Sequence, residues 1–233
     1  KWGNVHANYL RGNGANVNAL NASNISSGTL ATARMGSGTA SSSTFLRGDG
    51  TWAAAGGVTS DSDGNTVAGT NAGDSITSGM SNTMFGYNAG TAVTTAYSNT
   101  FIGQNAGIVA TTGGGNTGVG KEVFELLTTG VNNTAIGQTA LGDVVSTNWN
   151  VGIGSFAGSK LTGTGNTALG YNAMKGATGS TGSYNIGIGK DTGDALTTGD
   201  YNIHVGFEAG KAITTGGYNV AIGYEALKSQ TTA

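Results

Sequence analysis

The sequence predicts an all-β protein, a narrow parallel β-solenoid (β-roll) of ten repeats of about 17 residues, and three observations support this prediction. An Asn recurs ten times, at spacings of 17, 17, 17, 17, 17, 16, 19, 17 and 17 residues. The fourth residue after each Asn is Gly without exception, and the third is always apolar. The repeated Asn residues are Asn65, Asn82, Asn99, Asn116, Asn133, Asn150, Asn166, Asn185, Asn202 and Asn219.

The composition is unlike that of an ordinary globular enzyme. Of 233 residues, 44 are Gly, none is Pro or Cys, and only 9% are charged. Such a composition can indicate disorder, but the strict repeat argues against disorder from residue 61 onward. A net charge of −2 gives no reason to expect nucleic acid or an anionic membrane as a partner. The sequence has no transmembrane run and begins at Lys1, so we interpret it as a fragment or processed product.

We expect two parts, an N-terminal connector at 1–60 and the solenoid at 61–233. The connector contains a duplicated motif, Tyr9–Gly14 and Phe45–Gly50, in which an aromatic-Leu pair precedes Arg-Gly and a Gly-containing turn. This pattern is typical of a short strand that enters a tight turn. Residues 53–57 are predicted to be a linker.

Within each repeat, the first and third residues after the Asn are predicted to share one face of a short strand, because side chains two apart point the same way. The third position is apolar and the first is Thr, Val or Ile, so we expect both columns to face inward. The stacked Asn side chains are expected to hydrogen-bond from coil to coil. The Gly that follows is expected where φ is positive or backbones approach closely. Residues that define the repeat include Asn133, Gly137, Asn202, Gly206, Asn219 and Gly223.

The second residue after each Asn is then predicted to face outward. This column is small or apolar, which is unusual for a solvent-facing strand and favours self-association. We therefore expect a homotrimer whose interface contains Phe101, Ala135, Ala168 and Ala221. A second aliphatic column lies eleven residues after the Asn, and the irregular spacings predict a bulging loop at 175–183.

Several stretches resemble a known family. Residues 133–137, 166–170 and 219–223 read Asn-Thr-Ala-Ile-Gly, Asn-Thr-Ala-Leu-Gly and Asn-Val-Ala-Ile-Gly. They resemble repeats of bacteriophage tail-fibre shafts and the head repeats of trimeric autotransporter adhesins. Residues 20–30 and 45–52 are similar to stretches common in phage tail fibres. The resemblance implies a non-enzymatic, homotrimeric fibre segment on a virion, with sister chains, other tail proteins and a host-surface glycan as partners. The alternatives are a bacterial trimeric adhesin head and a glycan-cleaving tailspike.

Short motifs that look catalytic are better explained by the repeat. Residues 115–121 match most of a phosphate-binding loop, but Glu122 stands where Ser or Thr is needed. Residues 187–193 resemble a dinucleotide fingerprint only by their glycines. The Arg47-Gly48-Asp49 tripeptide is interpreted as a turn, since its sister copy ends in Asn13. No cofactor, metal site or catalytic residue is expected, with His6 and His204 far apart in the sequence.

Two further functions, glycan cleavage and ice binding, can be judged from the acidic column and the Thr column. The acids six residues after the Asn (Glu122, Asp191, Glu208 and Glu225) are interpreted as solubilising groups rather than a catalytic pair. Thr ladders occur in ice-binding solenoids, but here the predicted inward direction of the Thr column argues against that activity.

The best candidate for glycan or receptor contact is the aromatic column just before the Asn. It comprises Trp149, Tyr184, Tyr201 and Tyr218, whose alternative role is packing between coils or across chains. Further rings lie close by in the sequence, five residues after the Asn, at Tyr171, Phe207 and Tyr224.

Overall fold

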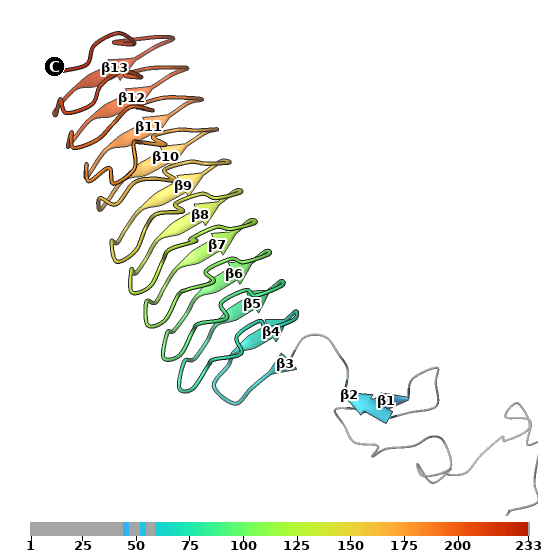
Figure 1. The fold of residues 1–233 in the computed structure, drawn as a ribbon. Coiled ribbons are helices and arrows are strands. Elements are labelled where there is room, and N and C mark those ends of the chain that lie inside the picture. Colours follow the sequence, from blue (N-terminus) through green and yellow to red (C-terminus); the bar gives the residue numbers. More distant parts are fainter. Residues whose placement is uncertain (1–43, 47–51, 55–58, 233) are drawn as a thin grey trace, which may run out of the picture. The chain divides into compact units, whose positions relative to one another are not determined.

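The computed structural model describes residues 44–46, 52–54 and 59–232, which belong to two units, 1–56 and 57–233 (Figure 1). In the first unit β1 (Thr44–Leu46) pairs antiparallel with β2 (Trp52–Ala54). The aromatic-Leu motif at Phe45 thus forms a strand, as predicted. The expected linker at 53–57 is wrong at its start, because Ala53 and Ala54 belong to β2. The sister motif at 9–14 and the tripeptide at 47–49 lie outside the described residues.

The second unit is a β-solenoid with one sheet of eleven strands (Figure 1). It begins with β3 (Thr59–Ser60), which pairs antiparallel with β4. The remaining strands are parallel, stand in chain order, and each consists of the three residues after a repeat Asn. They are β4 (Thr66–Ala68), β5 (Thr83–Phe85), β6 (Thr100–Ile102), β7 (Thr117–Val119), β8 (Thr134–Ile136), β9 (Val151–Ile153), β10 (Thr167–Leu169), β11 (Ile186–Ile188), β12 (Ile203–Val205) and β13 (Val220–Ile222). The predicted fold class is therefore confirmed.

The Asn column locks each coil to the next. The backbone amide and Nδ2 of Asn202 both donate to Oδ1 of Asn185, at 2.8 and 3.0 Å. Nδ2 of Asn202 also donates to the carbonyl of Gly216, at 2.9 Å, on the far side of the same coil. Asn133 makes the same pair of bonds with Asn116, and Asn219 donates to Asn202. Since most of these side chains are fully buried, every lost bond would leave a polar group without water, at about 1–3 kcal/mol.

The Gly column is required for two reasons. Gly137 and Gly206 adopt φ values of 127° and 133°, which other residues rarely adopt. In addition, a Cβ on Gly206 would lie 2.3 Å from the carbonyl oxygen of Gly223, and one on Gly137 would lie 2.6 Å from Gly154. Gly223 shares the conformation, with φ at 127°, but has open space beside it. The backbones of successive coils touch at this corner, so no side chain fits between them.

The predicted direction of the strand faces is wrong. Phe101, Ala135, Ala168 and Ala221 lie in the core with at most 1% exposure, so they cannot form an interface with sister chains. The columns expected inside face outward instead, and Ile136 is 41% exposed. The reason is the narrowness of the coil. Its interior accepts one side chain from the three-residue strand, on the same face as the buried Asn two residues earlier, and the two flanking side chains must point away.

The core is filled by a reciprocal pattern across the coil. Phe101, in the middle of β6, packs over Gly107, where an added Cβ would lie 2.8 Å from the ring. In the next coil the sizes are exchanged, with Phe124 packing over Gly118. The aliphatic column eleven residues after the Asn completes the core. Its fully buried members are Val93, Leu127, Val144, Leu161, Leu196 and Ile213.

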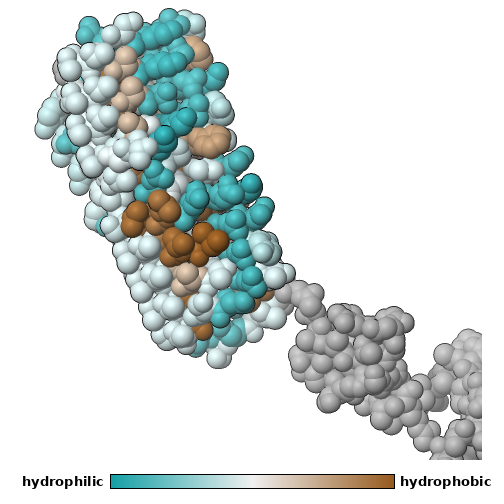
Figure 2. All heavy atoms as spheres, viewed as in Figure 1, coloured by the Kyte–Doolittle hydropathy of each residue, from teal (hydrophilic) through white to brown (hydrophobic). Residues whose placement is uncertain are grey.

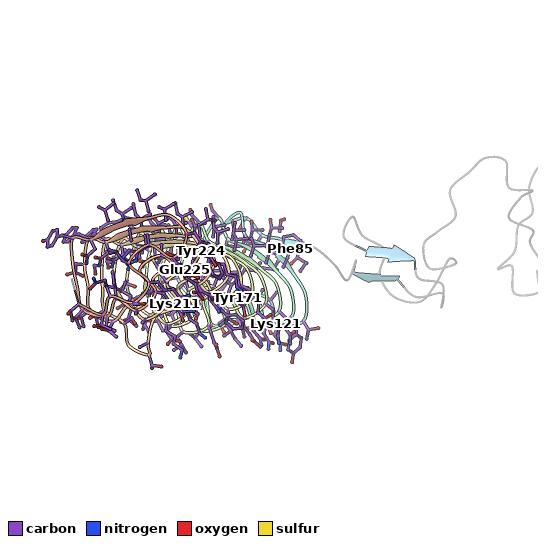
Figure 3. The ribbon with its side chains drawn as sticks, turned by 90° about the horizontal axis from the view of Figure 1, so that it is seen from above. Phe85, Lys121, Tyr171, Lys211, Tyr224 and Glu225 are labelled. Carbon is purple, nitrogen blue, oxygen red and sulfur yellow. The ribbon has the colours of Figure 1, made fainter. Side chains whose placement is uncertain are left out.

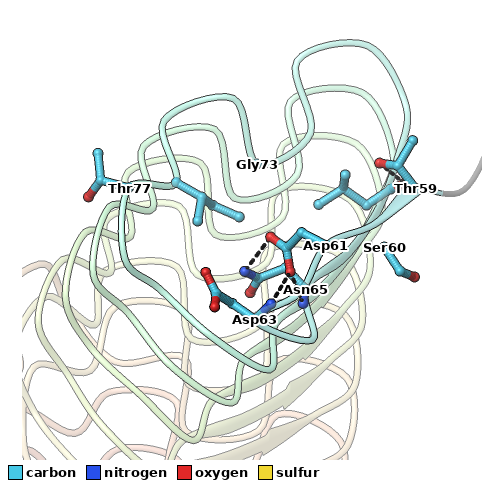
Figure 4. A pocket seen from close by; sticks show the side chains of 9 residues that line it. Thr59, Ser60, Asp61, Asp63, Asn65, Gly73 and Thr77 are labelled. Carbon is cyan, nitrogen blue, oxygen red and sulfur yellow. Dashed lines mark hydrogen bonds between the residues drawn. The ribbon is translucent and has the colours of Figure 1, made fainter.

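The N-terminal end of the solenoid is closed by polar groups (Figure 4). The Asp61 carboxylate accepts hydrogen bonds from the backbone amide and Nδ2 of Asn65, both at 2.8 Å. It thereby takes the place of the Asn Oδ1 that a preceding coil would supply. The antiparallel strand β3 covers the edge of β4 at the same end. A hollow of about 280 Å³ lies beside these groups.

The irregular coils contain the predicted loop. Ser180, within this loop, pairs with Leu161 of the preceding coil, and residues 177–179 are exposed. Gly176 and Gly179 have positive φ values of 75° and 77°, which glycine adopts readily. They lie on either side of the inserted residues. The extra residues of the long coil are extruded here without breaking the sheet.

Candidate functional site

The aromatic column before the repeat Asn occupies a strained backbone position. Trp149, Tyr184, Tyr201 and Tyr218 have φ values between 59° and 61°. The other six coils place Gly, Ser or Asn there, residues of small size or with tolerance for this region. A left-handed conformation disfavours a bulky side chain by roughly 1–2 kcal/mol. The aromatic rings must therefore make contacts that offset this strain.

The structure brings together three of these four rings. Tyr184 and Tyr201 stack with ring centroids 5.2 Å apart and 10° between planes, and Tyr201 stacks on Tyr218 at 5.2 Å and 13°. The other face of Tyr184 covers Gly165, where a Cβ would lie 2.8 Å from the ring. Trp149 takes no part in the stack, because the next coil has Gly165 at the equivalent position, between Trp149 and Tyr184. It is 59% exposed.

This stacking changes what the column can bind. The faces of Tyr184 and Tyr201 are covered by neighbouring residues, so a sugar ring can meet only their edges and hydroxyl groups. Open ring surface remains at Trp149 and at Tyr218, which is 80% exposed. Packing between coils, the alternative role of this column, is thus present at the three tyrosines.

A second aromatic column, five residues after the Asn, combines rings with a cation. Lys190 Nζ lies 5.9 Å from the ring centroid of Tyr171 and 5.6 Å from that of Phe207. Phe207 in turn stacks on Tyr224 at 5.3 Å. Tyr171 and Tyr224, both labelled in Figure 3, are 50% and 74% exposed. The sequence pattern indicates these rings but not the lysine between them, whose side chain is long enough to reach both neighbours.

The acidic column is paired with lysines. Glu208 contacts Lys211 and Lys228, each at 2.5 Å, and Glu225 contacts Lys228 at 3.0 Å. The hydrogen bond from Lys211 is the main reason why the pKa of Glu208 lies below its ordinary value. A glycosidase needs one carboxyl group with a raised pKa as its general acid. Glu208 has the opposite shift, and Glu122 and Asp191 also lie beside lysines.

Asp194 is the acid of the described part of the chain whose pKa is raised. Partial burial raises it, while the nearby charge of Lys175 acts in the opposite direction. Glu122, Asp191, Glu208 and Glu225 thus each form an ion pair with a lysine.

The glycine motifs and the histidines lie within the repeat. Residues 117–119 and 186–188, at the centre of the two loop-like motifs, form strands β7 and β11 rather than a strand-to-helix turn. His204 occupies the core column of β12 and is 1% exposed, and its Nε2 has no hydrogen-bond partner. His6 lies outside the described residues. In the described ranges no group of three or more His, Cys, Asp or Glu side chains could hold a metal ion.

Figure 2 shows one face of the solenoid, where a hydrophilic band runs along the coils and an apolar cluster lies beside it. Within the described ranges there is no helix of the length and apolar character that a membrane crossing requires. No protein-family model, curated protein or solved structure matches the chain.

Proposed function

We propose that the chain is a structural and adhesive segment of a homotrimeric viral fibre, carried on a phage tail and used in host attachment. The observation that carries this proposal is the outward face of the ten parallel strands. None of its residues is charged, and the exposed ones include Ile102, Ile136, Leu169, Ile186, Ile188, Ile203, Val220 and Ile222.

We expect this outward face of the sheet to be buried against other chains. Parallel sheets are normally covered on both faces, and a large apolar patch exposed to water promotes association. Here one face of the sheet covers the core and the other is open in the single chain. A second and third copy, packed about an axis parallel to the solenoid, would cover it along its whole length. The interface we propose is thus the Thr and Ile columns, in place of the buried column that contains Phe101.

Charged substitutions on this face test the assembly. Ile186→Lys together with Ile203→Lys would bring two added cations from every chain into the shared interface, and should convert the assembly to monomers in light scattering. Ala195→Lys is the matched control, because Lys160 occupies the equivalent position of another coil. A monomeric parent chain, or a double variant that stays trimeric, would contradict the proposed interface.

The virion location requires a separate experiment. Electron micrographs of phage labelled with an antibody to this chain should show the label along the tail fibres. Label on a bacterial surface, in the absence of virions, would instead support the adhesin alternative. Cleavage of a host glycan by the purified chain would support a tailspike.

Ice binding is a second candidate, because the Thr column faces outward. Thr66, Thr83, Thr100, Thr117 and Thr134 form this column on five consecutive strands. The neighbouring column varies from Ala68 to Phe85, which makes the face uneven. Measured thermal hysteresis in the parent chain, abolished by Thr100→Lys, would favour ice binding over a trimeric fibre.

A further inference from the structure

A surface hollow of about 310 Å³ lies across three consecutive coils, on the wall that faces the strands across the core. Phe156 and Tyr171 contribute aromatic rings to its lining, and Asn172 and Asp143 contribute polar groups. Lys160 and Lys175 also line the hollow. Because the outward face of the sheet lies on the other wall, trimer formation through that face leaves the hollow accessible.

The ring of Tyr171 has one partner and one open side. Lys190 of the following coil lies 5.9 Å from its centroid. The preceding coil has Ser155 in the equivalent position, and this side chain is too short to cover a phenol ring. The 50% exposure of Tyr171 is consistent with a ring face turned to the hollow. Unlike the stacked Tyr184 and Tyr201, this ring offers a flat apolar surface beside polar groups.

The two lysines are distinguished from the others in the described ranges. Lys121, Lys190, Lys211 and Lys228 each form an ion pair within 4.0 Å, whereas Lys160 and Lys175 form none. The amide of Lys160 donates to the carbonyl of Lys175 at 3.0 Å, so the two side chains start from adjacent backbone positions. Their ammonium groups are available as donors at the hollow.

The hollow also has hydrogen-bond acceptors beside these donors. The Asp143 carboxylate also lines the hollow, and the Asp194 carboxylate interacts electrostatically with both lysines. Nδ2 of Asn172 donates to Asp191 at 3.0 Å, which leaves Oδ1 of Asn172 able to accept from a ligand. Among the lining residues two lysines face one carboxylate, that of Asp143, and Asp194 lies near both lysines without lining the hollow. A lining that combines ammonium donors with carboxylate and amide acceptors suits a molecule with many hydroxyl groups.

We propose that this hollow binds a neutral hexose unit of a polysaccharide, with the C–H face of the sugar ring on Tyr171. Lys160 and Lys175 would donate to sugar oxygens, while Asp143 and Asn172 accept from sugar hydroxyl groups. The volume lies at the lower end of the range of ligand pockets, about 300–1,000 Å³, and matches a single ring. The proposal deepens the adhesive part of the proposed function, and it names a site distinct from the tyrosine column.

The test measures binding of glucose, galactose, N-acetylglucosamine, glucuronate and inorganic phosphate to the full 233-residue chain by saturation-transfer NMR and calorimetry. At least one neutral sugar should bind at millimolar concentration. Tyr171→Gln should weaken that binding at least about tenfold, since the variant loses both the stacking contact and the apolar area that the ring buries. Gln104 and Gln138 occupy the same column in other coils, so the variant is expected to fold.

Matched variants make the outcome decisive. Tyr87→Gln changes an exposed Tyr of the same column outside the hollow and should leave binding unchanged. Lys160→Ala copies the Ala that other coils carry at this position, Ala195 and Ala212, and should weaken binding without altering the oligomer measured by light scattering. The proposal is overturned if no neutral sugar binds, if only glucuronate or phosphate binds, or if Tyr87→Gln and Tyr171→Gln behave alike. A trimer that fails to bind sugar would refute this site and leave the fibre proposal standing.

Discussion

Phe101 occupies the space that Gly107 leaves open across the core of its own coil. Atoms of the phenyl ring lie 2.8 Å from where a Cβ on Gly107 would stand, so the two positions share one volume. Ala135 and Leu141 occupy the equivalent positions of another coil. There the small residue is on the strand and the larger one is on the opposing wall. Leu141 also fills the space beside Gly152 and Gly158 of the next coil, so neighbouring coils share the core volume between them.

We expect that the larger core residue of this coil can be moved from position 101 to position 107. Phe101→Ala leaves a cavity and should lower the free energy of unfolding by about 3–5 kcal/mol, measured by urea denaturation. Adding Gly107→Leu gives this coil the residue pair of Ala135 and Leu141 and should restore part of the loss, because the new side chain can enter the space that the ring of Phe101 leaves. Leu141 adopts φ of 50°, and Gly107 has φ of 58°, so the backbone permits this change. Equal stability of the single and double variants would show that the two sites are not coupled.

Removing one Asn should weaken the stack on both sides of its coil. Asn202→Ala deprives Asn219 of its acceptor and leaves the carbonyl of Gly216 unpaired, at about 1–3 kcal/mol for each buried group. Amide exchange should accelerate at residues 185–219 and much less at residues 65–116. Gln138→Ala is the control, because this exposed amide side chain lies outside the ladder. Uniform acceleration along the chain would point to global unfolding instead.

The Asp61 cap should make the first coil sensitive to acid. Hydrogen bonds from the Asn65 side chain and amide hold the pKa of Asp61 below its ordinary value of about 3.9. The folded form therefore binds fewer protons, and the stabilisation is fully present above about pH 3.9 and is lost as pH falls through the lower, folded pKa. Exchange of the Asn65 and Thr66 amides should rise in that range. In Asp61→Ala it should be fast already at neutral pH, whereas Asp63→Ala should behave like the parent chain.

His204 should make the C-terminal coils less stable below neutral pH. Burial lowers its pKa from an ordinary value of about 6.5. The unfolded chain then binds the proton more readily, so stability is fully present above about pH 6.5 and is lost as pH falls through the lower, folded pKa. Protonation would place a charge next to Gly193 and Gly210, where the ring has no room to move.

His204→Phe should remove this pH dependence and raise the melting temperature. The variant copies the arrangement of Phe101 over Gly107 and eliminates the unpaired Nε2, which is worth about 1–3 kcal/mol. Melting curves of both proteins between about pH 5 and 8, the range in which a histidine changes its charge, provide the measurement. A parallel decline of both curves would assign the pH dependence to other groups.

The positions of the aromatic columns could be predicted from the repeat. The orientation of their rings and the hollow beside Tyr171 could not. The column of Tyr184, Tyr201 and Tyr218 is visible in the sequence because strict spacing places equivalent residues in one line. Whether their ring faces point at solvent or at one another depends on the spacing between coils, which brings the rings to 5.2 Å. The hollow beside Tyr171 could not be predicted, since it depends on how side chains from three coils lie across one another.

The sequence by itself determined the solenoid, its period and its Asn and Gly columns, because these features depend on which residues recur and not on where they point. Only the tertiary structure decided which face of each strand is inside. Isoleucine and threonine are well suited to a buried strand, yet the coil is so narrow that its interior holds the middle residue of the strand alone. Ala135 therefore lies inside and Ile136 lies outside. The physical reason is volume: closing a coil of about 17 residues leaves too little space for the flanking side chains, and they are left on the face that a partner can cover.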